Sequence, residues 1–346
     1  MSEIGLADEI AAVIADFRQG EIARRSSADV MQFVEQIQRV CQQWMNAREK
    51  TLFLEGLRDS LKSQYWSGPK ISIELERLLP TLRMGTSKST WAILSIQDTY
   101  SSQSSLVNKV ERADIPVISA VIEGVDALLY IDDATFTGKT LAKYLDVIAS
   151  QIKTIEKRPS KILVWHLCEY SLEVKEVMKS PVTKLAEQGV SVLFHQVDQF
   201  RRRDADGRGA AAMIPSKNLA TLPGVQRFLN SFSAFKKFSD SDLLWRDPKI
   251  VINDRLFGSV ERRDVVERAF LEVGCWLRSQ TPNWNALMRP FGFVASFTEP
   301  SLGFGSMFCT CFNSSNTSPV ALWWGDPDAK FSALSIWKPL LPRRAQ

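Results

Sequence analysis

Histidine and cysteine are scarce in this chain, with two and five copies among 346 residues. Because the cysteine number is odd and no C-x-x-C spacing occurs, we expect reduced thiols and an intracellular protein. The cysteines are Cys41, Cys168, Cys275, Cys309 and Cys311. His166 and His195 stand in apolar runs, so we expect them to be buried and hydrogen-bonded. No cluster has the spacing of a zinc site, and no Ser-His-Asp arrangement can be placed, so hydrolysis by a triad is not supported.

Long apolar runs and a strong charge of either sign are also missing. No stretch approaches the roughly 20 apolar residues of a membrane span, and the acid-bearing amphipathic start of the chain is not that of a signal peptide. We therefore expect a cytoplasmic protein without a membrane partner. The net charge of +4, with 24% charged residues, is too mild to predict direct nucleic-acid binding.

The N-terminal part of the chain has the periodicity of amphipathic helices. Apolar residues recur at helical spacing over residues 26–44, where Ser26 and Asp29 are placed as a capping box, and again over residues 53–65. Residues 1–80 are thus predicted to form a helical region without visible chemistry. Packing on the rest of the protein is favoured for this region over contact with a partner protein.

The middle of the chain alternates between strands and helices. An apolar strand at 128–131 precedes a helix over 141–155, a strand at 162–167, a helix near 174–185 and a strand at 190–197. A further strand at 250–252 and a helix over 265–277 complete the pattern. Strands separated by helices predict an open, mostly parallel α/β sheet.

The most informative stretch extends from Leu128 to Thr140 and reads L-L-Y-I-D-D-A-T-F-T-G-K-T. A buried strand brings Asp132 and Asp133 to its carboxyl end, where ligands of open α/β sheets bind. A Thr/Gly turn and a helix start follow at once, so backbone N–H groups and hydroxyls converge there. The pattern predicts a site for a phosphorylated sugar. An acidic strand end before an ordinary capped helix is the alternative.

The same residues resemble the phosphoribosyl-pyrophosphate (PRPP) motif of type I phosphoribosyltransferases. The resemblance implies that Asp132 and Asp133 bind the ribose hydroxyls and act as the catalytic carboxylates, with Mg²⁺ held through the ligand. It also implies that the 5′-phosphate is bound by Thr135, Thr137, Gly138, Lys139 and Thr140. Thr135 stands where the motif has an apolar residue and Phe136 where it has a small hydroxyl or acidic one. These departures leave open an altered or lost transferase activity.

Two rival motifs fit these residues less well. A haloacid-dehalogenase phosphatase needs a second Asp two positions after the first, and position 134 is alanine. A Walker A loop needs an earlier glycine, which is missing before Gly138, and the two acids would repel a triphosphate. The phosphosugar interpretation is therefore preferred.

Further anion-binding residues are predicted before and after this motif. The turn over residues 83–90 is a candidate pyrophosphate loop, although such turns also cap helices. Its candidate ligands are Arg83, Gly85, Thr86, Ser87 and Lys88. Arg201 and Arg203 stand in a charged loop after the strand at 190–197, where arginines could reach a pyrophosphate or a base, although a solvated loop is the default.

The C-terminal segment carries a second resemblance. Residues 313–319, with Asn313 and Asn316 as ligand candidates, and the ending W-K-P-L-L-P-R resemble the tail of phosphoribosyltransferase-like proteins of bacterial conflict and anti-phage systems, including retron-associated ones. A tight turn is the alternative for the Asn-rich stretch.

Together the patterns predict an α/β fold, with an open, mostly parallel sheet of the type I phosphoribosyltransferase kind. An N-terminal helical addition (1–80), a core (81–258) and a C-terminal α+β extension (259–346) are expected. The resemblance implies an effector that binds PRPP or a ribose 5-phosphate nucleotide with Mg²⁺, in anti-phage defence of the retron type. The alternative is a non-enzymatic nucleotide-sensing or scaffold module that binds a partner such as a reverse transcriptase or an associated subunit.

Overall fold

The structure is a computed structural model of the 346-residue chain. It describes residues 1–84, 90–97, 101–110, 115–136, 138–169, 171–199, 212–231, 245–246, 254, 256–281, 285–294, 301–326 and 333–343. The chain divides into two compact units. Residues 68–200 are called here the α/β unit, and residues 1–67 with 201–346 the helical unit.

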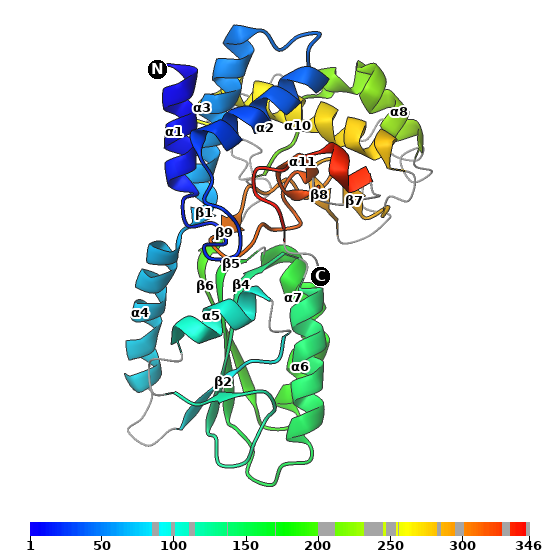
Figure 1. The fold of residues 1–346 in the computed structure, drawn as a ribbon. Coiled ribbons are helices and arrows are strands. Elements are labelled where there is room, and N and C mark those ends of the chain that lie inside the picture. The colour runs from blue at the N-terminus through cyan, green and yellow to red at the C-terminus, as the bar shows by residue number, and fades with distance from the viewer. Residues whose placement is uncertain are drawn as a thin grey trace. The chain divides into compact units, whose positions relative to one another are not determined.

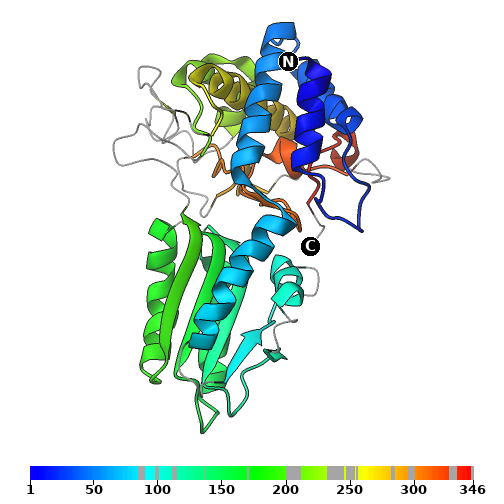
Figure 2. The same cartoon turned by 90° about the vertical axis from the view of Figure 1, so that its left-hand side faces the viewer.

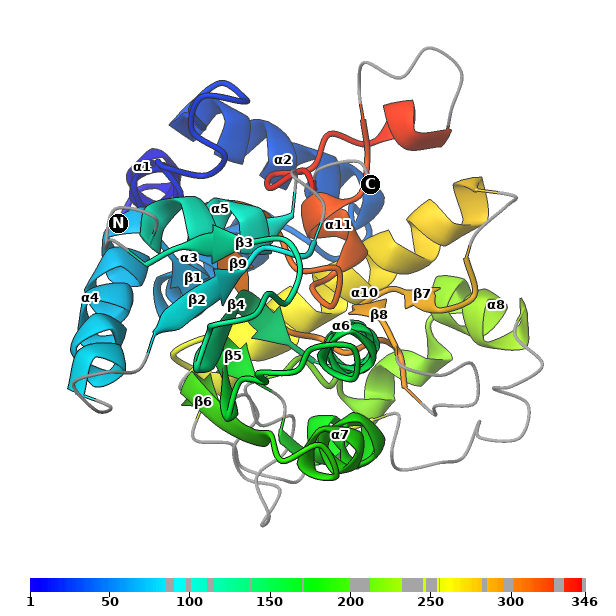
Figure 3. The same cartoon turned by 90° about the horizontal axis from the view of Figure 1, so that it is seen from below.

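The α/β unit is built on a five-stranded sheet with the order β3-β2-β4-β5-β6 (Figures 1 and 3). Its strands are β2 (Trp91–Leu94), β3 (Val117–Ile118), β4 (Ala127–Thr135), β5 (Lys161–Glu169) and β6 (Ser191–Gln199). All neighbouring pairs are parallel, so the predicted parallel sheet is confirmed. Its helices are α4 (Gly68–Met84), α5 (Ser102–Val110), α6 (Lys139–Ile152) and α7 (Ser171–Ala186).

The helices of this unit cover both faces of the sheet. Helices α6 and α7 lie on one face, and α4 and α5 lie on the other side (Figures 2 and 3). Leu128 and Tyr130 of β4 pack in a buried cluster with apolar residues of α6 and α7. Since alternate side chains of a strand point to the same face, Asp132 belongs to the face covered by α6. The predicted helix over 141–155 and the strands at 162–167 and 190–197 are confirmed as α6, β5 and β6.

The helical unit contains the predicted N-terminal helices. Its elements are α1 (Glu3–Val13), α2 (Ser27–Val40), α3 (Ala47–Gln64), β1 (Tyr65–Trp66), η2 (Lys217–Thr221), α8 (Pro223–Ser231), α10 (Val260–Gln280), β7 (Met288–Arg289), β8 (Gly292–Phe293), β9 (Cys309–Thr310), α11 (Val320–Trp323) and η3 (Ala333–Ile336). The expected capping box is present, because the Ser26 hydroxyl accepts from the Asp29 N–H and the Asp29 carboxylate accepts from the Ser26 N–H. Helix α10 packs on α3, α2 and α8.

A buried ionic network holds the beginning of α10. The Arg263 guanidinium, which is fully buried, pairs with Asp254 and with Glu267, at 2.8 Å from the Glu267 carboxylate. Arg246 reaches the second oxygen of Glu267 at 3.1 Å. Burial raises the pKa of Glu267 and the two arginines oppose that shift. Buried charges are tolerated because each one has a partner.

The C-terminal segment approaches other backbone very closely. Strand β9 pairs in parallel with β1, with Tyr65 opposite Cys309, so the two ends of the chain share one small sheet. Gly292 has φ +97°, and a Cβ atom there would lie 2.5 Å from the carbonyl carbon of Thr317. Such a position accepts only glycine. The sequence pattern did not indicate this close packing.

The domain boundaries predicted from the sequence stay a prediction. The contact-based units combine both ends of the chain, whereas the prediction divided it into three consecutive segments. The predicted strand at 250–252 lies outside the described residues. Among the helices that the structure describes, none is long and apolar enough to cross a membrane.

Candidate functional site

The carboxyl end of β4 brings two acids together. Residues 127–131 are fully buried, which fixes the direction of the strand, and the next two residues are Asp132 and Asp133. Asp132 is buried and Asp133 is partly exposed. Open α/β sheets bind their ligands at this end of the strands. The acids therefore stand where the sequence analysis expected them.

Asp132 has four polar partners, which come from β4, from α5 and from the segment between β2 and α5. Its Oδ2 accepts from Gln97 Nε2 at 2.6 Å and from the Tyr130 hydroxyl at 3.1 Å. Its Oδ1 lies 2.9 Å from the Asp133 N–H and 3.2 Å from the Ser102 hydroxyl. A carboxylate oxygen has two lone pairs, so both oxygens of Asp132 are fully engaged.

The Ser102 hydroxyl lies between the two carboxylates. Its oxygen is 3.2 Å from Asp132 Oδ1 and 2.9 Å from Asp133 Oδ1. A hydroxyl has a single hydrogen, so both contacts are satisfied together when one of the carboxyl groups is protonated. Burial, followed by the charge of Asp133, raises the pKa of Asp132 to about 7. The geometry and the direction of this shift agree that Asp132 readily keeps a proton.

The segment between β2 and α5 is fixed by its own hydrogen bonds. The fully buried Gln103 accepts, through Oε1, from the backbone N–H groups of Ile96 at 3.1 Å and Gln97 at 2.9 Å. These bonds hold the Gln97 backbone beside β4. The Ser101 hydroxyl accepts from the Ser104 N–H at 3.2 Å and caps α5, which leaves the Ser102 hydroxyl for the acids.

The turn after β4 leads directly into α6. Thr135 and Phe136 are buried, and Thr135 lies opposite Glu169 in the ladder between β4 and β5. Gly138 has φ +70° and starts α6 without a side-chain cap. The first turn of a helix has N–H groups without intrahelical partners, which favours an anion at this point. Lys139 and Thr140 begin the helix with exposed side chains, whereas Thr137 lies outside the described residues.

His166 lies next to Asp132 on β5. The two residues are direct neighbours in the ladder, and the His166 ring meets the Tyr130 ring edge-on with centroids 6.3 Å apart. The side chain is fully buried, as expected, whereas His195 on β6 is exposed, so the expectation of burial was wrong for that residue. The expected hydrogen bonds of His166 are not found, because neither ring nitrogen has a partner within the described part of the chain. Burial lowers the pKa of His166 to about 3, so the ring is neutral.

Several predicted ligand residues cannot be placed at this site. Gly85, Thr86, Ser87, Lys88, Arg201 and Arg203 lie outside the described residues. Arg83 falls in the last turn of α4, and its side chain is not described. Asn313 and Asn316 belong to the helical unit, where the Asn313 Oδ1 accepts from the Ser314 N–H at 3.0 Å and the Asn316 carbonyl from the Phe293 N–H at 2.8 Å. Their roles as ligands stay predictions.

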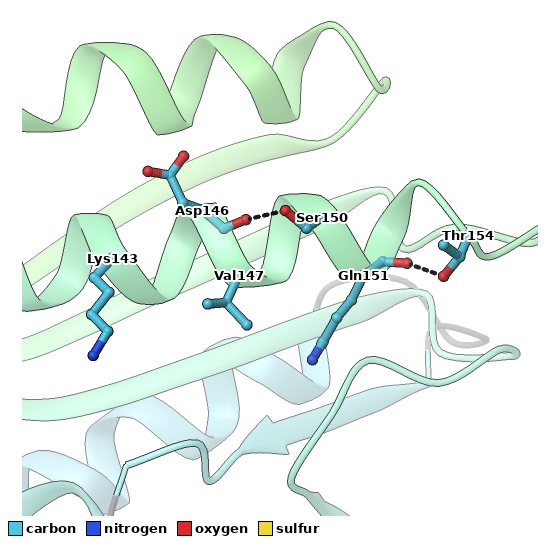
Figure 4. Close-up of a pocket in the computed structure, with 6 residues that line it drawn as sticks. All are labelled: Lys143, Asp146, Val147, Ser150, Gln151 and Thr154. Atoms are coloured by element: carbon cyan, nitrogen blue, oxygen red, sulfur yellow. Dashed lines mark hydrogen bonds between the residues drawn. The ribbon is translucent and has the colours of Figure 1, made fainter.

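A shallow hollow on the α/β unit offers a less suitable place for chemistry. Its volume is about 730 Å³, and it follows the outer face of α6 (Figure 4). The lining residues are Lys143, Asp146, Val147, Ser150, Gln151 and Thr154. The Ser150 and Thr154 hydroxyls donate to carbonyls of the same helix, and Asp146 pairs with Lys184 at 2.7 Å. The hollow therefore lacks the pair of adjacent carboxylates found at the end of β4.

Comparisons with known proteins assign the chain to a family. The model of one protein family, PRTase-CE, matches residues 25–343. The chain belongs to the PRTase-CE family. This PRTase-CE chain is phosphoribosyltransferase-like in family and fold. An orotate phosphoribosyltransferase from Aeropyrum pernix is similar at 17% sequence identity and a TM-score of 0.25, over 38% of this chain and 72% of that chain. No curated protein matches the chain.

The donor set of this PRTase-CE chain can be compared with the demands of Mg²⁺. Asp132, Asp133 and Ser102 offer carboxylate and hydroxyl oxygens, which are the hard donors that Mg²⁺ prefers. Among the residues that the structure describes, no group of three or more His, Cys, Asp and Glu side chains could hold a metal. The oxygen donors at the end of β4 are thus of the chemical kind that Mg²⁺ takes.

Sequence reasoning missed Gln97, Ser102 and Tyr130 as partners of the acids. Trp91–Leu94 was not predicted as a strand, so the Ser/Gln-rich segment after it had no place in the fold. An apolar run followed by a polar turn is the same pattern as in the β4 motif. That signal could have placed Ser102 at the carboxyl end of a neighbouring parallel strand.

Proposed function

We propose that this PRTase-CE chain binds PRPP, or another ribose 5-phosphate compound, together with Mg²⁺ at the carboxyl end of β4. The observation that supports the proposal is the direct succession of an acid pair, a left-handed glycine turn and the start of α6. Carboxylates accept hydrogen bonds from sugar hydroxyls, while the start of a helix favours phosphate. One ligand that carries both groups matches the two halves of the site.

The residues of the chain would act by positioning and by electrostatics. Asp132 and Asp133 would bind the ribose hydroxyls, and the backbone at Gly138 and Lys139 would hold the 5′-phosphate. A nitrogen nucleophile or water then displaces pyrophosphate from C1 of the ribose, and the carboxylates stabilise the positive charge that develops on the sugar. When bound through the ligand by Asp132 and Asp133, Mg²⁺ would supply charge neutralisation on the pyrophosphate.

The strength of phosphate binding follows from the number of hydrogen bonds. Each hydrogen bond to a charged group contributes about 1.5 to 3 kcal/mol. A loop with several such donors is therefore expected to hold a phosphosugar with a dissociation constant in the micromolar range. Asp132 and Asp133 would add specificity for the hydroxyls of ribose.

Titration calorimetry tests this proposal. The wild-type chain is expected to bind ribose 5-phosphate, and PRPP with Mg²⁺, whereas the Asp132→Asn/Asp133→Asn variant should lose most of this affinity. Asp146→Asn is a matched control, since Asp146 is an exposed carboxylate on α6 paired with Lys184. The proposal is refuted if the wild type binds neither compound, or if the double variant binds as well as the wild type.

The engaged oxygens of Asp132 favour a second, non-enzymatic function. Both oxygens of Asp132 are engaged within the protein, and the motif position of Phe136 carries a large buried ring. These features suit a module that senses a nucleotide, or serves as a scaffold for a partner protein, without turnover. A pyrophosphate-release assay separates the two functions. Binding without release of pyrophosphate, tested with a panel of nitrogen acceptors and with water, would favour the sensor.

We also propose that the chain acts in anti-phage defence, in a system of the retron type. The resemblance of its C-terminal segment to proteins of bacterial conflict systems supports this role. A plaque assay with the wild type and the Asp132→Asn/Asp133→Asn variant tests the role. Equal protection by both would show that the acids are dispensable and would leave only the scaffold, with a reverse transcriptase or associated subunit as the expected partner.

A further inference from the structure

The contacts of Asp132 pose a problem for any sugar ligand. Each of its two oxygens already has two partners, from Gln97, Tyr130, Asp133 and Ser102. A carboxylate accepts about four hydrogen bonds in all. A ribose hydroxyl can therefore bond to Asp132 only when one of the four present donors leaves.

Three of the four donors are firmly attached. The Asp133 N–H belongs to the ladder strand β4, and the Tyr130 side chain is fully buried in the sheet. Gln97 Nε2 bonds to both the Tyr130 hydroxyl at 2.7 Å and Asp132 at 2.6 Å, and the Gln97 backbone is tied to Gln103. These three contacts can therefore be broken only if the end of the strand unfolds.

The fourth donor, Ser102, can leave without disturbing the fold. Its hydroxyl makes the longest of the four contacts, at 3.2 Å, and the side chain is partly exposed. Ser101, and not Ser102, caps α5, so the helix does not depend on this hydroxyl. A rotation about χ1 to another staggered rotamer is enough to remove the oxygen from both acids.

We propose that Ser102 is a specificity-determining residue of the site, whose hydroxyl stands in for a ribose hydroxyl between Asp132 and Asp133 and must be displaced by the sugar. This inference rests on the proposed function. A ligand with hydroxyls at C2 and C3 replaces the single hydrogen of Ser102 with two donors, one for each carboxylate. A ligand that offers only a phosphate leaves Ser102 in place. Ser102 thus imposes a displacement cost on ribose compounds that free phosphate does not meet, and the two hydroxyls of ribose compensate for it at both carboxylates.

Titration calorimetry with Ser102→Ala tests this inference. Loss of the competing hydrogen bond is expected to tighten the binding of ribose 5-phosphate by roughly three- to tenfold. Binding of inorganic phosphate should not change, and the gain should be smaller for 2-deoxyribose 5-phosphate. Ser102→Thr keeps the hydroxyl and should restore the wild-type affinity.

The matched control is Ser105→Ala, in the same helix, whose hydroxyl donates only to the Ser101 carbonyl at 3.3 Å. A structural defect caused by Ser102→Ala would weaken binding, so a gain in affinity is specific to the inference. Equal or weaker binding of ribose 5-phosphate by Ser102→Ala would overturn it, while leaving the proposed function intact. If neither the wild type nor Ser102→Ala binds ribose 5-phosphate, the proposed function itself fails and the inference fails with it. If Ser102→Ala binds ribose 5-phosphate and the wild type does not, the inference is supported.

Discussion

The raised pKa of the buried Asp132 predicts how the free energy of unfolding changes with pH. The folded protein holds a proton on this residue up to a pKa of about 7, against the ordinary value of 3.8. Between these values the folded chain binds more protons than the unfolded chain, so this group stabilises the fold at low pH. That stability is lost as the pH rises through 7.

The size of the effect follows from linkage. On going from pH 8.0 to pH 5.5, Asp132 is expected to add about 2 kcal/mol to the free energy of unfolding. Asp132→Asn removes this titration and keeps a side chain of similar shape. The difference in free energy of unfolding, wild type minus variant, should therefore be larger at pH 5.5 than at pH 8.0 by about 2 kcal/mol.

Urea unfolding, followed by the fluorescence of the tryptophans, measures both free energies at each pH. The comparison uses the same two pH values for wild type and variant, so titration of all other groups largely cancels. Asp146→Asn supplies the same chemical change on the exposed face of α6. If the difference between wild type and Asp132→Asn is the same at both pH values, the inference that the Asp132 carboxyl is protonated in the folded protein is wrong.

Three further predictions concern buried groups. The pKa of His166 is about 3 in the folded protein, against the ordinary value of 6.5, so the stability of the fold falls as the pH drops below 6.5. Between pH 8.0 and pH 5.5 the free energy of unfolding should decrease by about 1.4 kcal/mol through this group. His166→Leu should abolish that decrease, as measured by urea unfolding. Gly292→Ala should lower the free energy of unfolding by roughly 2 to 3 kcal/mol, measured by thermal melting, since φ is +97° and Thr317 blocks the new methyl group. Arg263→Met should cost about 3 to 5 kcal/mol in the same assay, because Glu267 loses a buried partner; an unchanged melting temperature would contradict either expectation.

A second, partly exposed group of ion pairs joins distant parts of the chain within the helical unit. Arg262 at the start of α10 pairs with Glu55 and Asp59 of α3, at 2.8 Å in each case. About two hundred residues separate these partners along the chain. No local pattern indicates such a pairing. The prediction of three consecutive segments was drawn from local patterns alone, and it stays a prediction.

The occupied acid pair connects the two proposed functions. An enzyme and a sensor would both have to displace Ser102 before a ribose could reach Asp132. The two functions differ only in whether a nucleophile then reaches C1. The affinity of Ser102→Ala therefore informs on ligand entry, and pyrophosphate release informs on chemistry, so the two measurements answer separate questions.

The α/β elements were predictable because their signals are local. The apolar run before Asp132 and the apolar period over residues 141–155 produced β4 and α6, since burial of one face requires that spacing. The acid pair and the glycine turn were found for the same reason, because a strand end and a helix start are adjacent in the chain. The short strand β2 has only four residues and was missed.

The sequence by itself determined which residues form the strand end, the acid pair and the start of α6, because these features follow one another within a single short segment. Only the tertiary structure decided what the acids contact. Gln97 and Ser102 precede Asp132 by 35 and 30 residues, and they reach it because β2 pairs beside β4 in the parallel sheet. The raised pKa of Asp132 and the neutral state of His166 also depend on burial, which neighbouring strands and helices create together.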